Sequence, residues 1–178
     1  MKILLLLGAA AFAGLTTAAA ESGPPAVVSR VDLDRYLGTW YEIAAIPARF
    51  QKNCVAASAT YGRRADGKID ILNTCRVKTL DGRVKSARGK AWVVDPTTNA
   101  KLKVQFFWPF NGDYWILELD AEYGWVVIGS PDRKYLWILG RARTMDPVLY
   151  ADLASRAAAK GFDTSKLRPT PQPADPER

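Results

Sequence analysis

The chain has 178 residues, a length that suits one domain of ordinary size. It contains no histidine, which excludes a Ser-His-Asp triad and any acid–base chemistry that depends on histidine. The formal net charge of +7 fits either attraction to anionic membrane surfaces or an ordinary solvated surface, but the basic residues are too scattered to indicate a nucleic-acid partner.

The first predicted element is a targeting segment. Residues 1–20 combine one lysine, an apolar run and a small-residue end, a pattern typical of a secretory signal peptide. A transmembrane anchor is the alternative, although the apolar run is short. No cysteine precedes Cys54, so we expect no lipidated cysteine and a periplasmic protein, with association to the outer membrane left open. Residues 21–31 contain a Gly-Pro-Pro sequence and predict a flexible leader.

Eight apolar or alternating segments follow, and turn-forming residues separate them. They predict strands over residues 39–46, 55–63, 68–76, 83–94, 100–107, 113–120, 124–130 and 135–142. Ala65-Asp66-Gly67 is a hairpin signal between the second and third strands. Regularly spaced short strands of this kind favour an antiparallel sandwich or barrel.

One helix is predicted after the strands. Thr144 or Asp146 can cap its start, and Pro147 suits its first turn. Leu149, Leu153 and Ala157 recur at helical spacing, so the helix should pack outside the sheet along this apolar stripe. Residues 162–167 can add an edge strand. The domain therefore spans residues 32–168, and residues 169–178, with four prolines, predict a disordered tail.

Cys54 and Cys75 are the only two cysteines. In an oxidising compartment an even pair most simply forms one disulfide, and two free thiols are the alternative. Their positions at the ends of the second and third strands would place the disulfide at the rim of the sheet. Two cysteines without a histidine fall short of the four ligands of a zinc site, so no metal is expected.

Closing the eight strands into a barrel brings Trp40 and Arg141 together. The first and eighth strands become neighbours, and a guanidinium over an indole face is a favourable cation–π pair. Gly38 would let the backbone turn tightly beside the large ring. Residues 32–37 can then cover this end of the barrel. Glu42 shares the strand face of Trp40, so a pairing with Arg141 is expected.

These residues carry a family resemblance over about residues 30–168. Gly38-Thr39-Trp40 resembles the Gly-x-Trp signature of the lipocalins, the Asp120…Tyr123 stretch looks like their second motif in divergent form, and Arg141 matches the third. The chain looks similar to the bacterial outer-membrane lipocalins close to apolipoprotein D. The resemblance implies an all-β fold: an eight-stranded antiparallel up-and-down barrel with one C-terminal helix outside. It also implies a fatty-acid or lysophospholipid ligand and no cofactor.

Strand direction sorts the inward-facing residues by depth and places Tyr114 near the mouth of the barrel. An aromatic interior with a few polar groups suits an apolar ligand, while packed core is the alternative for each residue taken singly. The predicted ligand contacts are Ala57, Asn73, Phe106, Trp108, Tyr114, Ile116, Tyr135, Trp137 and Leu139. Glu118 should face inward without a partner, unless a one-residue bulge turns it outward.

The leading functional prediction is a non-enzyme that stores or transports a lipid for membrane maintenance. Basic rim residues could meet an anionic head group, or could be ordinary surface charge; they are Arg49, Lys52, Arg76 and Lys85. One alternative is an enzyme of the same fold that uses a free cysteine or Glu118. Another is a protein-binding module, a membrane contact or a homodimer formed through the aromatic loops at Phe50 and residues 108–110.

Overall fold

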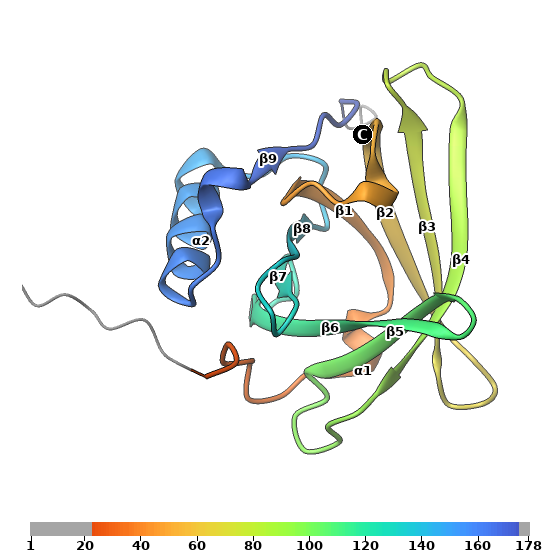
Figure 1. Ribbon diagram of the computed structural model, residues 1–178, viewed down its shortest axis with the longest axis vertical. Coiled ribbons are helices and arrows are strands. Elements are labelled where there is room, and N and C mark those ends of the chain that lie inside the picture. Colours follow the sequence, from red (N-terminus) through yellow and green to blue (C-terminus); the bar gives the residue numbers. More distant parts are fainter. Residues whose placement is uncertain (1–22, 175–178) are drawn as a thin grey trace, which may run out of the picture.

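The computed structural model describes residues 23–174, so the predicted signal peptide over residues 1–20 lies outside the described residues. The strands form one antiparallel sheet that closes on itself (Figure 1). They are β1 Gly38–Ala45, β2 Cys54–Arg63, β3 Ile69–Val77, β4 Val84–Val93, β5 Lys101–Phe107, β6 Phe110–Leu119, β7 Trp125–Gly129, β8 Leu136–Gly140 and the short β9 Arg168–Pro169.

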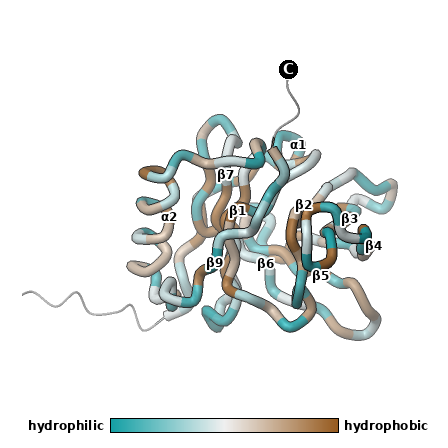
Figure 2. Tube along the Cα trace, turned by 90° about the horizontal axis from the view of Figure 1, so that it is seen from above, coloured by the Kyte–Doolittle hydropathy of each residue, from teal (hydrophilic) through white to brown (hydrophobic). Residues whose placement is uncertain are grey.

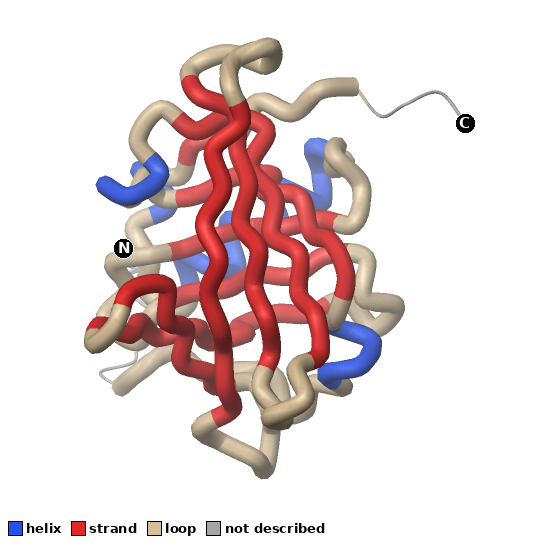
Figure 3. The backbone as a smooth tube through the Cα atoms, turned by 90° about the vertical axis from the view of Figure 1, so that its right-hand side faces the viewer, coloured by secondary structure: helices blue, strands red, loops and turns tan. Residues whose placement is uncertain are grey.

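The closure of the sheet is carried by β1. Each strand from β2 to β7 pairs with the next one in sequence, and β1 pairs with both β8 and β2. Tyr41 lies opposite Gly140 of β8, and Trp40 lies opposite Ala59 of β2. Figure 3 shows how the strands on the near side cross those behind them. The predicted eight-stranded up-and-down barrel is therefore confirmed.

The helices are α1 Leu33–Tyr36 and α2 Pro147–Ala159, with single 3-10 turns η1 Arg49–Gln51 and η2 Thr164–Lys166. The Asp146 side chain caps α2 by accepting hydrogen bonds from the amides of Val148 and Leu149, at 2.8 and 3.1 Å. Leu153 and Ala157 of α2 are fully buried. The helix packs on the outside of the barrel, as its apolar stripe predicted (Figure 1).

Side-chain alternation along the strands produces two hydrophobic clusters. On β7, Val126 and Ile128 point into the barrel, while Val127 between them packs in the cluster that includes α2. Viewed from above, hydrophobic segments gather along the central strands (Figure 2). The sheet is consequently apolar on its inner face and again on the part of its outer face that the helix covers.

Bulges shift the register within four strands. They lie between Glu42 and Ala44 on β1, between residues 55 and 58 on β2, between residues 104 and 107 on β5, and between Ile116 and Glu118 on β6. The β6 bulge places Glu118 opposite Val127, on the outer face. There Glu118 pairs at 3.0 Å with Lys160, the residue that follows α2. The expectation of an inward, unpartnered Glu118 was therefore wrong, and the bulge alternative is correct.

The segments flanking the barrel are more ordered than the sequence predicted. Val31 is fully buried, and its amide donates a hydrogen bond to the carbonyl of Thr98 at 2.7 Å. At the other end, the amide of Thr170 donates to the carbonyl of Ile43 at 2.9 Å. The leader from Val27 onward and the tail as far as Gln172 thus contact the barrel, while residues 21–22 of the predicted leader and 175–178 of the predicted tail lie outside the described residues.

The edge strand also differs from its predicted position. Residues 162–167 contain the 3-10 turn η2, and the strand β9 begins only at Arg168. This strand pairs with Ala44 and Ala45 of β1, beyond the point where β1 and β2 separate. The side-chain amide of Gln172 then donates hydrogen bonds to the backbone carbonyls of Glu42 and Ala57, at 2.8 and 2.9 Å. It thereby bridges the gap between β1 and β2.

Candidate ligand-binding site

The closed end of the barrel is built around Trp40, whose side chain is fully buried. The Arg141 guanidinium lies 3.9 Å from the Trp40 ring centroid. It also donates hydrogen bonds to the carbonyls of Arg35, Leu37 and Thr39, at 2.8 to 2.9 Å. The predicted stacking of Arg141 on Trp40 is confirmed, and the guanidinium also fixes the chain that leads into β1.

Gly38 meets two requirements at this end. Its φ angle of +93° lies in the left-handed region, which side chains other than hydrogen disfavour. A Cβ atom at this position would also lie 3.2 Å from Nη1 of Arg141. The glycine therefore allows both the turn into β1 and the close approach of the guanidinium.

The short helix α1 covers the closed end of the barrel, as predicted for residues 32–37. Asp32 caps it by accepting a hydrogen bond from the amide of Asp34 at 2.9 Å. Tyr36 is only 2% exposed, and its carbonyl accepts a hydrogen bond from Nε1 of Trp40 at 2.8 Å. The interior is accordingly sealed at this end by aromatic side chains.

The interior above this seal is lined mainly by apolar and aromatic residues. Six of the predicted ligand contacts lie on inward-facing positions or beside the interior: Ala57, Asn73, Phe106, Ile116, Trp137 and Leu139. Ile116 and Leu139 are buried, whereas Asn73, Phe106 and Trp137 are partly exposed although they belong to the inner face. Solvent therefore reaches part of the inner face at these three residues.

The other three predicted ligand contacts lie at different depths along the barrel axis. Trp108 is 86% exposed at the tip between β5 and β6, and Tyr135 is 37% exposed at the rim. Tyr114 lies opposite Leu102, near the start of β5, and its hydroxyl contacts that of Tyr36 in α1 at 2.6 Å. Tyr114 is therefore deep, not near the mouth, because β6 begins three residues earlier than the predicted strand.

A cluster of three tyrosine hydroxyls was not anticipated from the sequence. Tyr36, Tyr61 and Tyr114 form what we call the tyrosine cluster. The Tyr114 hydroxyl lies 2.6 Å from that of Tyr36 and 2.8 Å from that of Tyr61. Inward-facing tyrosines on β2 and β6 were the available signal, but the register that brings them together depends on how the barrel closes.

Glu42 is buried, at 8% exposure, but it does not pair with Arg141. Its carboxylate accepts hydrogen bonds from Thr170 Oγ1 at 2.6 Å and from Gln51 Nε2 at 2.7 Å. The side-chain oxygen Oε1 of Gln51 in turn accepts a hydrogen bond from Nε1 of Trp137 at 3.0 Å. The expected pairing was wrong, because the Arg141 guanidinium is bonded instead to backbone carbonyls of residues 35–39.

Burial raises the pKa of the Glu42 carboxyl above its ordinary value of 4.5, and the hydrogen bonds from Thr170 and Gln51 oppose that rise only in part. The folded state therefore binds the proton more tightly than the unfolded chain does. The stabilisation by the neutral acid is fully present below pH 4.5 and is lost as the pH rises through the raised pKa.

Glu42→Gln tests this carboxyl, because a neutral amide can keep a donor toward Thr170 and an acceptor for Gln51. We expect the variant to match the natural protein near pH 4 and to become increasingly more stable than it as the pH rises. Urea unfolding at several pH values measures the difference. Glu122→Gln is the matched control, since the Glu122 side chain is 89% exposed and its replacement should add no comparable pH dependence. A pH-independent effect of Glu42→Gln would contradict the account.

Cys54 and Cys75 form the predicted disulfide, with their Cα atoms 5.5 Å apart. It joins the start of β2 to the end of β3 at the open end of the barrel. Among residues 23–174 no group of three histidine, cysteine or acidic side chains is placed to hold a metal ion. No helix within this range is both long and apolar enough to cross a membrane.

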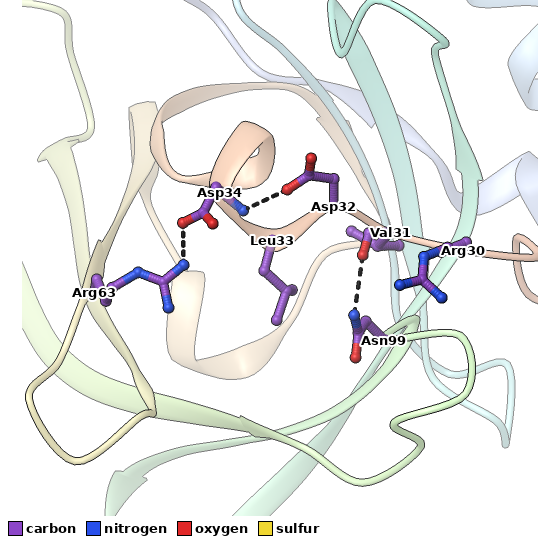
Figure 4. A pocket seen from close by; sticks show the side chains of 7 residues that line it. All are labelled: Arg30, Val31, Asp32, Leu33, Asp34, Arg63 and Asn99. Atoms are coloured by element: carbon purple, nitrogen blue, oxygen red, sulfur yellow. Dashed lines mark hydrogen bonds and ion pairs between the residues drawn. The ribbon is translucent and has the colours of Figure 1, made fainter.

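A hollow with a volume of about 400 Å³ lies outside the barrel, beside α1 (Figure 4). Its lining includes the ion pair between Arg63 and Asp34, and a hydrogen bond of 3.2 Å from the Asn99 amide to the carbonyl of Val31. Arg30, Asp34 and Arg63 are exposed, so this hollow is polar and wide open. It is less suited to an apolar ligand than the barrel interior is.

Apolar side chains also gather around the open end. Nine large hydrophobic residues of the described chain are exposed, and only Val94 and Val148 lie elsewhere. The other seven form what we call the mouth ring: Phe50, Leu80, Val84, Phe107, Trp108, Phe110 and Tyr135. The exposed charged residues of the same end are mostly basic: Arg49, Lys52, Lys78, Arg83, Lys85 and Lys134, against Asp81 and Asp132.

Comparison with known proteins agrees with this geometry. A family model described as a lipocalin-like domain matches residues 31–172. The chain is 43% identical to temperature-induced lipocalin-1 of Arabidopsis thaliana, with 82% of each chain covered. It is 39% identical to the outer membrane lipoprotein Blc of Escherichia coli, with 97% of this chain and 99% of that protein covered.

More distant similarity extends the same picture. Apolipoprotein D of Macaca fascicularis is 35% identical, with 98% of both chains covered. The crystal structure of lobster apocrustacyanin A1 superposes with a TM-score of 0.65 at 17% identity, covering 85% of this chain and 91% of that one. The Gly38-x-Trp40 signature, its Arg141 partner, the closed eight-stranded barrel and these relatives together establish that the chain belongs to the lipocalin family.

Proposed function

We propose that this protein binds one single-chain lipid, a fatty acid or a lysophospholipid, inside the barrel and carries it for membrane maintenance. The observation that supports this most directly is the interior itself. Partly exposed aromatic side chains, Phe106 and Trp137, lie on the inner face of a barrel whose other end is filled by the buried Trp40. A cup of this shape buries an apolar chain, and each Å² of buried apolar surface contributes about 25 cal/mol.

Small side chains beside these aromatic residues support the proposal. Ala59 faces inward on β2, and Gly89 lies opposite Ile71 of β3. A Cβ atom at Gly89 would lie 2.7 Å from the Phe106 ring, so the glycine makes room for that ring. Replacing small inward residues by large ones should therefore fill the space that the lipid occupies.

Ala59→Phe is the variant that tests the site. It adds a ring to the inner wall, and we expect it to weaken fatty-acid binding at least about tenfold, because excluding several methylene groups from the interior removes roughly 0.8 kcal/mol for each. Thr60→Phe is the matched control, since the next residue of β2 faces outward. Quenching of tryptophan fluorescence by an added fatty acid measures both. Equal binding by the two variants, or binding by neither them nor the natural protein, would contradict the proposal.

The enzymatic alternative loses the groups on which it depended. A thiolate would require a free cysteine, but Cys54 and Cys75 are joined in a disulfide. A base in the interior would require Glu118, but that carboxylate faces outward and pairs with Arg156 of α2 and with Lys160. Lipid binding is therefore the function that the interior supports best.

We further propose that the mouth ring docks on an anionic membrane surface. Exposed aromatic residues suit the interface between head groups and acyl chains, and the surrounding lysines and arginines suit anionic lipids. Docking would place the open end of the barrel against the lipid that it exchanges. The name of the Escherichia coli relative, an outer membrane lipoprotein, supports a location in the cell envelope for this chain as well. A homodimer formed through the same ring is the competing arrangement.

A further inference from the structure

The tyrosine cluster leaves one hydroxyl proton without an acceptor. Three phenol groups carry three protons, but only two contacts join them, both to the Tyr114 oxygen. Tyr36 and Tyr61 are 2% and 6% exposed, and among residues 23–174 their hydroxyls have no other hydrogen-bond partner. Either oxygen of each pair can be the donor; we take both of the more buried hydroxyls to donate to Tyr114, which leaves the proton of the less buried Tyr114 over.

The leftover proton points to the interior. Tyr114 faces inward on β6 and is partly exposed, unlike the other two members of the cluster. Tyr114 is therefore the least buried member of the cluster, on the inner face near the closed end. A group that enters the barrel this far would meet its hydroxyl as a donor.

Asn73 supplies an unpaired acceptor on the same wall. Its Oδ1 atom is buried and has no hydrogen-bond partner. Asn73 lies opposite Ala59 on β2, and Tyr61 is the next inward-facing residue along that strand. Diagonal neighbours in a sheet lie about 7–8 Å apart, so this amide and the tyrosine cluster are close to each other on the inner wall.

The surroundings favour a neutral partner over a charged one. Burial raises the pKa of Tyr36 and Tyr114 well above the ordinary value and that of Tyr61 to about 12, so all three hydroxyls remain protonated donors. The nearby guanidinium of Arg141 is bonded to the carbonyls of the chain that leads into β1. This guanidinium is therefore already engaged, and an anionic group buried here would be costly.

We propose that Tyr114 and Asn73 form a polar subsite that takes the hydroxyl or un-ionised carboxyl end of the single-chain lipid. Such a group accepts a hydrogen bond from Tyr114 and donates one to Asn73. The lipid then enters polar end first, and its hydrocarbon chain lies along Phe106 and Trp137 toward the mouth. This inference rests on the proposed lipid binding and narrows it, because a lysophospholipid with its head group at the rim would leave both groups unpaired.

Paired ligands separate this subsite from apolar burial alone. Dodecanol donates and accepts, whereas dodecyl methyl ether has the same chain but only accepts. We expect the natural protein to bind the alcohol about fivefold more tightly, the worth of one net hydrogen bond. Asn73→Leu should abolish this preference and leave binding of the ether unchanged. Tyr114→Phe should weaken both ligands by a similar factor, because it removes the donor that both use.

Stability gives a second readout that needs no ligand. Replacing the unpaired Asn73 amide by leucine should raise the thermal midpoint of the empty protein by about 2–4 °C. Tyr41→Phe, on the outward-facing residue next to Trp40, is the control and should keep the preference for the alcohol. Equal binding of alcohol and ether by the natural protein, or a preserved preference in Asn73→Leu, would overturn the inference. If neither ligand binds the natural protein at all, the proposed lipid binding itself fails.

Discussion

Arg141→Ala is expected to lower the free energy of unfolding by about 3 kcal/mol, because it removes three charge-assisted hydrogen bonds and a cation–π contact at once. The carbonyls of Arg35, Leu37 and Thr39 lose their donor, and the Trp40 ring loses the cation that lies 3.9 Å from its centroid. For a chain of this length the thermal midpoint should fall by roughly 6–12 °C. Chemical denaturation followed by tryptophan fluorescence measures the loss.

Two further variants show whether charge or geometry is responsible. Arg141→Lys keeps the positive charge but lacks the planar fork that reaches several carbonyls, so it should recover less than half of the loss. Arg88→Ala, on an exposed arginine of β4, should change stability by less than about 0.5 kcal/mol. If Arg141→Ala unfolds with the same midpoint as Arg88→Ala, then Arg141 does not close the barrel as described.

Replacing Phe107, Trp108 and Phe110 together by serine should weaken binding to anionic vesicles at least about 100-fold, since each aromatic ring contributes on the order of 1–2 kcal/mol when it leaves water. These three side chains are 75–86% exposed in the structure, so their removal should leave the fold intact. Sedimentation with vesicles that contain phosphatidylglycerol measures the binding. Added salt should weaken it further, because the basic residues of the open end act through screened charges.

The protein offers a matched control for this variant. Val94 and Val148 are also exposed, at 48% and 77%, but they lie outside the mouth ring. Serine at both positions should leave vesicle binding within about twofold of the natural protein, since single exposed apolar residues are common on soluble domains. Equal losses in the two variants would refute docking through the open end. A dimer that dissociates only in the aromatic variant, without any vesicle binding, would favour the homodimer instead.

The parts of the fold that local sequence patterns determine were predictable. Alternation and turn residues located all eight barrel strands to within a few residues, and the Asp146 cap located α2. The stacking of Arg141 on Trp40 followed from a single requirement, that the first and last strands of a closed barrel are neighbours. The pairing of two cysteines in one disulfide needed only their number and their strand positions.

The errors have three causes, and the first is a single extra residue that changes the direction in which the side chains of a strand point. A bulge leaves no distinctive mark in the sequence, yet the one in β6 reversed the orientation predicted for Glu118. The partners of Glu42 come from η1 and from the C-terminal segment, which the strand pattern does not place relative to β1. The depth of Tyr114 depended on where β6 begins, and the boundaries of strands are the least certain part of any such prediction.

The measurement that tests the central claim most directly is native mass spectrometry of the protein purified without detergent from its own cells. We expect one protein chain that carries one lipid, and extraction should yield a single-chain molecule with a hydroxyl or carboxyl group. Lipid binding in the barrel would be contradicted if only the mass of the ligand-free chain is detected and added fatty acids do not quench its tryptophan fluorescence.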